Sequence, residues 1–141
     1  MKNIIALFLL ISSFGWAQQT KVFTQQLEKA KIEHKKVLLY FSGSDWCAPC
    51  IKFKKFMVNT EEFQNFANEN LLLYNVDFPR QSKNKLSNEV EKENEVLAEK
   101  YNPKGLFPLI LLLDTNGKVL KRWEGYPTES VAKFIEKLKA P

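Results

Sequence analysis

The sequence predicts an α/β fold in which helices flank a central mixed β-sheet. Continuous apolar runs of strand length alternate along the chain with stretches whose apolar residues recur at helical spacing. The composition is 45% hydrophobic and 13% aromatic, which is enough apolar surface for a packed core. Domains commonly hold about 100–200 residues. The 141 residues, which contain no internal repeat, therefore predict one domain.

The N-terminal segment has the order of a secretory signal peptide. Lys2 gives it a positive start, an apolar run follows over Ile4–Ile11, and the small residues Gly15 and Ala17 precede a polar pair. A membrane-spanning helix needs about 20 apolar residues, and this run is shorter. We expect residues 1–17 to be the signal peptide, with cleavage after Ala17, and residues 18–141 to be the domain. The protein should then be exported, periplasmic or secreted, without stable membrane insertion.

The first half of the domain alternates between helical and extended patterns. A helix is expected over Val22–Glu33, a strand covered on both faces over Val37–Phe41, and a turn over Ser42–Asp45. Helical spacing begins at Cys47, and Thr60 with two following glutamates predicts the cap of another helix. The helical spacing after Cys47 is carried by Ile51, Phe53, Phe56 and Met57, which recur at about 3.6-residue intervals.

The second half predicts three more strands and two more helices. Strands are expected over Leu71–Asp77, Leu109–Leu113 and Lys118–Glu124, with a helix reaching Tyr101 between the first two. The pair Asn116-Gly117 predicts a tight hairpin because both residues tolerate positive φ. Thr128 is expected to cap the last helix. Strands separated by helices should be parallel, and the hairpin should add an antiparallel edge.

The two cysteines of the chain lie in one motif, Cys47-Ala48-Pro49-Cys50. A disulfide that closes so short a loop contributes little stability as a staple, because the entropic gain grows with loop length. A structural zinc site wants four ligands, and His34, which stands in a charged run, is the one histidine available. We therefore expect no metal, an exposed His34, and a disulfide that is made and broken.

The chain resembles the thioredoxin family. The resemblance rests on Trp46-Cys47-Ala48-Pro49-Cys50 directly after a buried strand, on Phe107-Pro108 at the start of the penultimate strand, and on the order of elements. The lead-in Gly43-Ser44-Asp45 is similar to that of exported thioredoxin-like proteins, including the periplasmic domains of thiol:disulfide interchange proteins. The resemblance implies a thioredoxin fold and thiol–disulfide exchange without a cofactor.

In that fold Cys47 opens a helix, where free backbone N–H groups and the helix dipole favour a thiolate. Cys47 is the expected nucleophile, and Cys50, three residues on, the expected resolving thiol. Pro49 fits early in a helix because its missing N–H would be unpaired there. The resemblance further implies that Pro108 is cis and faces the motif, that Phe107 binds the substrate backbone, and that Trp46 flanks the nucleophile.

One departure from the family concerns proton transfer. Thioredoxins carry a buried aspartate in the strand before the motif, near a lysine, whereas this chain has Tyr40-Phe41 at the matching place. The lysine-equivalent part of Leu71–Asp77 reads as apolar, and Asp45 and Lys52 are expected to face solvent. Proton transfer to Cys50 would then use water or another group.

The net charge of +5 is spread over interleaved lysines and glutamates, and it forms no basic stripe with aromatics of the kind that binds nucleic acid. The leading hypothesis is an exported thiol–disulfide oxidoreductase that reduces protein disulfides and receives electrons from a membrane thiol reductant. The alternatives are a reductant dedicated to cytochrome c maturation and a non-catalytic binding module with a permanent disulfide.

Overall fold

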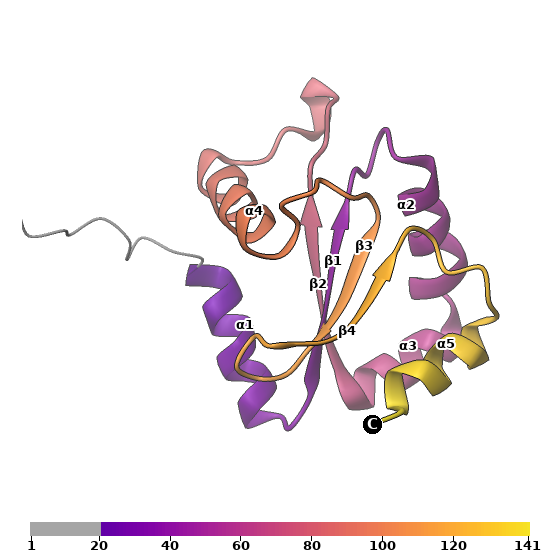
Figure 1. Cartoon of the computed structure of the whole chain (residues 1–141). Helices are drawn as coiled ribbons and strands as arrows, with labels where there is room; N and C mark the ends of the chain where they lie inside the picture. Colours follow the sequence, from indigo (N-terminus) through magenta and orange to yellow (C-terminus); the bar gives the residue numbers. More distant parts are fainter. Residues whose placement is uncertain (1–20) are drawn as a thin grey trace, which may run out of the picture.

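The computed structural model describes residues 21–141, so the predicted signal peptide lies outside the described residues. Within this range the sequence folds into one alternating series of helices and strands (Figure 1). The elements are α1 (Lys21–Ile32), β1 (Lys36–Ser42), α2 (Ala48–Phe53), the π-helical turn η1 (Lys54–Val58), α3 (Glu61–Asn70), β2 (Leu71–Asp77), the short 3₁₀ turn η2 (Ser82–Asn84), α4 (Asn88–Tyr101), β3 (Leu109–Leu113), β4 (Val119–Glu124) and α5 (Val131–Lys139).

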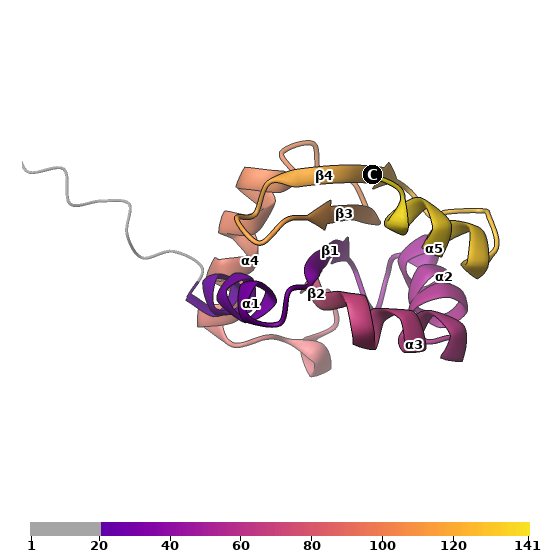
Figure 2. The same ribbon diagram turned by 90° about the horizontal axis from the view of Figure 1, so that it is seen from below.

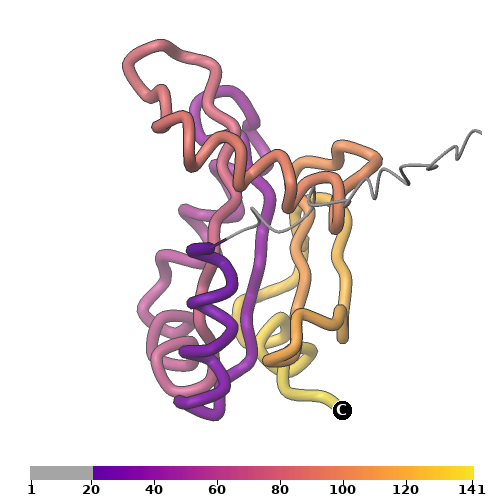
Figure 3. The backbone as a smooth tube through the Cα atoms, turned by 90° about the vertical axis from the view of Figure 1, so that its left-hand side faces the viewer, coloured from indigo at the N-terminus to yellow at the C-terminus, as the bar shows by residue number. Residues whose placement is uncertain are grey.

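The strands form one mixed sheet in the order β2-β1-β3-β4. β1 and β2 are parallel, but β3 is antiparallel to β1, so the expectation that all strands separated by helices run parallel was wrong. The reason is the course of α4, which lies crosswise to the strands (Figure 3). The chain therefore enters β3 at the end of the sheet where it left β2: Asp77 pairs with Ser42, and Leu109 pairs with Phe41.

Helices cover both faces of the sheet (Figure 2). On one face α1 and α4 pack against alternate strand residues such as Leu39 and Phe41. On the other face α2, α3 and α5 pack against the intervening residues, such as Leu38 and Tyr40. β1 and β3 are continuous apolar runs covered on both faces, as was predicted for Val37–Phe41.

Only part of the apolar surface of the helical segment after the cysteine motif is buried in the core. Phe53 and Met57 are buried, whereas Ile51 and Phe56 are 45% and 51% exposed, so two of the four apolar positions that predicted the helix face the core. Phe56 lies in the π-helical turn, in which the Asn59 N–H donates to the Lys54 carbonyl at 2.8 Å. The wider turn rotates Phe56 out of the row that Phe53 begins.

Caps and turns agree with the sequence at most positions. The Thr60 hydroxyl accepts from the Phe63 N–H and caps α3 as predicted, but Ser130, not Thr128, caps α5. Helix α5 begins at Val131, the first residue of its apolar face, so the cap falls immediately before it. In the β3–β4 hairpin Gly117 has a positive φ of 78° and Asn116 does not, because the Asp114 carboxylate accepts from the Asn116 N–H and holds the turn.

Candidate active site

The cysteine motif lies at the end of the sheet where β1 and β2 finish and β3 begins. Cys47 and Cys50 form a disulfide with a Cα–Cα distance of 5.2 Å. Both residues are nearly buried, at 4% and 3% exposure, whereas Ala48 and Pro49 between them are exposed. Solvent therefore reaches Ala48 and Pro49, whereas the two cysteines are shielded from it.

Cys47 is the N-cap residue of α2. Its backbone is extended, and the Cys50 N–H points at the Cys47 Sγ at a distance of 3.3 Å. A donor aimed at a sulfur atom stabilises the thiolate over the thiol, because the negative charge strengthens the hydrogen bond. Cys50 lies inside the helix without such a cap, so the local backbone distinguishes the two sulfur atoms.

Trp46 is held against the motif by four contacts. Its indole N–H donates to the Phe78 carbonyl at 2.7 Å, and its ring meets the Phe107 ring edge-on at 5.3 Å. The Arg80 guanidinium lies 3.9 Å from the centre of the indole ring. A Cβ atom placed on Gly43 would come within 2.2 Å of the indole, so only glycine leaves room for the tryptophan there.

Phe107 and Pro108 lie beside the Trp46 ring. The peptide bond between them is cis, as the family resemblance implies, and Pro108 stands immediately before β3. The Phe107 ring contacts both Trp46 and Phe78, at 5.3 and 5.7 Å between ring centres. The structure thus brings Trp46, Phe107 and Pro108 to the same end of the sheet as the cysteines.

Asp45 is partly exposed to solvent, in agreement with the sequence prediction, and it also anchors the loop after β2. Its carboxylate accepts from the backbone N–H groups of Arg80 and Gln81, both at 2.9 Å, and from the Asn84 amide at 3.0 Å. These bonds, the Arg80 N–H first, lower the pKa of Asp45 below its ordinary value. Lys52 does face solvent, as expected.

The surroundings of Cys50 are more polar than the sequence suggested. Strand β2 was expected to be apolar beside the motif, but Asn75 pairs with Tyr40 and Asp77 pairs with Ser42, all on the face that α2 covers. The error arose because the side chains of a strand alternate between the faces. The apolar Val76 lies on the opposite face of the sheet, so its character does not predict the polarity of the face beside Cys50.

Sequence reasoning missed three residues that shape the site: Gly43, Arg80 and Asp77. Arg80 and Asp77 reach the site through contacts between residues 35 apart along the chain, Asp45 with Arg80 and Ser42 with Asp77. One signal was available for Gly43, because a glycine near a large aromatic residue often marks a close approach. His34, which was expected to be an exposed loop residue, is exposed with a positive φ of 54°.

The chain matches a protein-family model and is similar to known proteins. A family model described as a thioredoxin-like domain matches residues 23–140. The disulfide bond reductase DsbH of Chlamydia pneumoniae is 35% identical over 122 residues, which are 86% of this chain and 71% of the relative. A solved structure of a DsbH oxidoreductase matches with a TM-score of 0.75 at 35% identity, over 83% of this chain and 78% of that one.

A more distant match shows the fold alone. The oxidised C-terminal domain of DsbD from Neisseria meningitidis matches with a TM-score of 0.55 at 22% identity, over 82% of this chain and 89% of that one. Within residues 21–141 no helix has the length and apolar character needed to cross a membrane.

Proposed function

This chain belongs to the thioredoxin-like family and is a thiol–disulfide oxidoreductase, and from that premise we propose that it reduces protein disulfides after export. The observation that carries the proposal is the disulfide between Cys47 and Cys50, whose first sulfur atom receives the Cys50 N–H at the start of α2. The reducing direction is supported by the name of the relative from Chlamydia pneumoniae, a disulfide bond reductase.

In the proposed reaction the reduced protein attacks with the Cys47 thiolate. The thiolate forms a bond to one sulfur of the substrate disulfide, and the other substrate sulfur leaves with the electron pair. Cys50 then attacks Cys47 Sγ, the mixed disulfide breaks, and the second substrate sulfur leaves. The substrate gains two electrons, and the protein returns to the disulfide state in which it is described here.

We assign substrate contact to the surface beside Cys47. Trp46 and Phe107 together form an aromatic edge at the motif, and Pro108 fixes the chain immediately before β3. An extended substrate segment would bind there by strand-like backbone hydrogen bonds to Phe107. Because the phenylalanine ring is bulky and packed against Trp46, we expect a preference for substrates with small residues next to the cysteine.

Export and electron supply complete the proposal. The charged, apolar and small-residue order of residues 1–17 supports cleavage after Ala17. An exported dithiol needs a source of electrons outside the cytoplasm, and a membrane thiol reductant would supply them to the Cys47–Cys50 disulfide. N-terminal sequencing of the exported protein should begin at Gln18.

Trapping with cysteine variants tests the enzyme directly. Cys50→Ser keeps the attacking thiol but cannot resolve the mixed disulfide, so substrate proteins should stay attached and appear on non-reducing gels. Cys47→Ser is the matched control, since it also leaves one thiol in the motif but should trap nothing. Thiol-blocked lysates of the expressing cell, run with and without dithiothreitol, distinguish covalent capture from ordinary binding.

Two results would overturn the proposal. If Cys50→Ser captured no protein that dithiothreitol releases, the motif would not perform exchange and the chain would be a binding module. If the wild-type protein instead introduced disulfides into a reduced substrate faster than it removed them, the direction would be wrong.

A further inference from the structure

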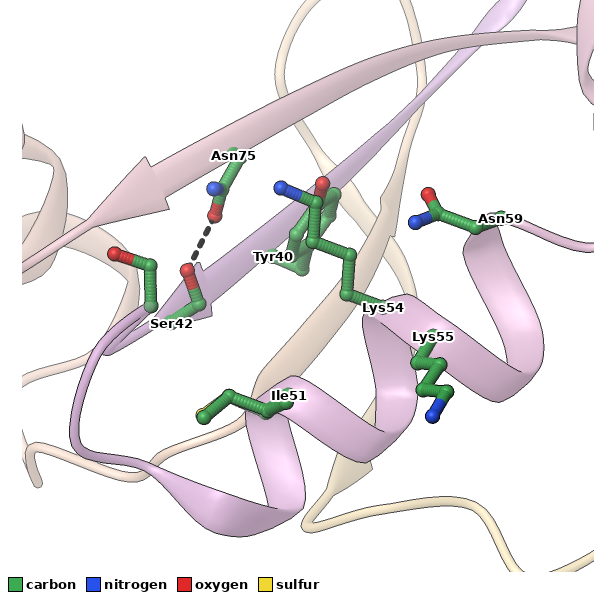
Figure 4. A pocket seen from close by; sticks show the side chains of 9 residues that line it. Tyr40, Ser42, Ile51, Lys54, Lys55, Asn59 and Asn75 are labelled. Atoms are coloured by element: carbon green, nitrogen blue, oxygen red, sulfur yellow. Dashed lines mark hydrogen bonds between the residues drawn. The ribbon is translucent and has the colours of Figure 1, made fainter.

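A cavity of about 240 Å³ lies beside Cys50, between β1, β2 and the helical segment α2–η1 (Figure 4). Side chains from both strands and from the helical segment line it. They belong to Tyr40, Ser42, Ser44, Cys50, Ile51, Lys54, Lys55, Asn59 and Asn75. Cys50 is 3% exposed and is one of the residues that line this cavity, so the cavity offers its thiol a route for exchanging a proton with water.

Two serines that line the cavity, Ser42 and Ser44, are hydrogen-bonded to the carboxylate of Asp77. The Ser42 Oγ lies 2.6 Å from the Asn75 Oδ1 and 3.0 Å from the Asp77 Oδ1 (the bond to Asn75 is drawn in Figure 4). A hydroxyl has one proton, so Ser42 donates to one of these oxygens at a time and can turn between them. Ser44 adds two bonds to Asp77, from its N–H at 2.8 Å and its hydroxyl at 2.6 Å.

Water fits between Cys50 and this network. One buried water needs about 15 Å³ of cavity and two to four polar partners. The volume is many times larger, and the hydroxyl and amide groups of Ser42, Ser44, Asn59 and Asn75 provide such partners. A proton can therefore pass from the Cys50 Sγ through water to the Ser42 hydroxyl, and from there to Asp77.

The other titratable groups at the cavity do not compete with Asp77 as proton acceptors. On β1, burial and then the charge of Asp77 raise the pKa of Tyr40 to about 12, so its phenol stays protonated at neutral pH. On η1, Lys54 extends toward Tyr40 and Asn75 and Lys55 lines the rim, but an ammonium group has no lone pair to offer (Figure 4). From α4 the neutral Asn94 reaches Asp77, at its backbone carbonyl.

We propose that Asp77, acting through Ser42 and cavity water, accepts the proton that Cys50 loses when it resolves the mixed disulfide. The inference rests on the proposed function. In the step the S–H bond of Cys50 breaks, its sulfur forms the bond to Cys47, and the bond between Cys47 and the substrate sulfur breaks. The electron pair leaves with the substrate thiolate, and the proton moves to the Asp77 carboxylate and then to solvent.

The test separates the two chemical steps in single turnovers. Reduced protein is mixed with a peptide disulfide that carries a fluorophore, and acid-quenched samples are analysed by mass spectrometry for mixed disulfide and product. For Asp77→Asn we expect an unchanged rate of mixed-disulfide formation. Resolution at pH 6–7 should slow about 10²-fold, the lower end of what a general base supplies. The difference should shrink as the pH rises further, because hydroxide then removes the Cys50 proton without help from Asp77.

A second variant and a control keep the inference falsifiable. Ser42→Ala breaks the path but leaves the two Ser44 bonds to Asp77, so it should slow resolution with the same pH dependence. Asp114→Asn is the matched control, because Asp114 also accepts backbone N–H groups but in the β3–β4 turn. It should change stability alone.

Wild-type resolution kinetics in Asp77→Asn or Ser42→Ala across this pH range would overturn the inference and leave Asp77 as a structural anchor. Failure of the wild-type protein to form any mixed disulfide is a different result, which would contradict the proposed function itself.

Discussion

Cys47 and Cys50 are three residues apart, but the chain surrounds them with different chemistry. Cys47 lies beside aromatic rings, with Trp46 packed on Phe107 and covered by Arg80. Cys50 faces a cavity to which the strands contribute Tyr40, Ser42 and Asn75. We propose from this comparison that the Cys47 side meets the substrate protein and that the Cys50 side handles the proton.

The largest expected effect is a difference in reactivity between the two thiols. Reduced Cys50→Ser should react with iodoacetamide at pH 6 about 10²-fold faster than reduced Cys47→Ser, because a thiolate stabilised at a helix start is the reactive species. The Cys50 N–H that caps Cys47 supplies this stabilisation. Alkylation rates measured by mass spectrometry check it, and equal rates would remove the distinction between the two cysteines.

A larger residue at position 43 should impair the reaction with substrate at Cys47 but not the resolution step at Cys50. In Gly43→Ala the new Cβ would overlap the Trp46 indole, which cannot remain where it is. We expect kcat/KM for a protein disulfide to fall about tenfold, equivalent to about 1.4 kcal/mol. The resolution rate in single turnovers should not change.

The matched control is Gly117→Ala, which strains a positive-φ turn at the opposite end of the sheet. It should lower the unfolding temperature without altering kcat/KM of the folded protein. An unchanged kcat/KM in Gly43→Ala would show that the position of Trp46 does not matter for substrate.

A variant in the loop after β2 should perturb the surroundings of Trp46 less than Gly43→Ala does. Arg80→Ala removes the guanidinium from the Trp46 ring. An exposed cation–π contact is worth about 0.5–1 kcal/mol, so KM should change by about two- to fivefold while kcat stays constant. Lys83→Ala on the same loop is the control, and an equal effect of both variants would point to general charge instead of the ring contact.

The smallest effect is expected from pH. The pKa of Asp45 is lowered in the folded protein, so the carboxylate stabilises the fold above the ordinary value of 3.8. That contribution is lost as the pH falls from there through the folded pKa. Unfolding midpoints measured between pH 2 and pH 5 should therefore fall less steeply for Asp45→Asn than for the wild type. Parallel curves would mean that the bonds to the loop carry no stability.

The sequence predicted the parts of this molecule that local patterns determine. The strands Leu71–Asp77 and Leu109–Leu113 have the predicted bounds, because an apolar run of strand length identifies each of them. The cap at Thr60 and the hairpin at Gly117 were also predicted, since each depends on a few adjacent residues. The roles of Cys47, Cys50, Trp46, Phe107 and Pro108 remain predictions.

Features that depend on distant contacts could not be predicted in this way. The direction of β3 follows from the crosswise course of α4, which no local pattern records. The polar network beside Cys50 joins Ser42 to Asp77, 35 residues later, through the pairing of β1 with β2. The anchoring role of Asp45 could not be predicted for the same reason, because its partners Arg80 and Gln81 are brought to it by the fold.

The central claim is that the Cys47–Cys50 pair serves as a reductant, and its redox potential tests this most directly. The protein without residues 1–17 is equilibrated in dithiothreitol or glutathione buffers, and Trp46 fluorescence with thiol trapping reports the oxidised fraction. A reductant should give a potential near the reducing end of the family, about −270 mV. A value near about −120 mV, or a disulfide that resists reduction until the protein unfolds, would contradict the claim.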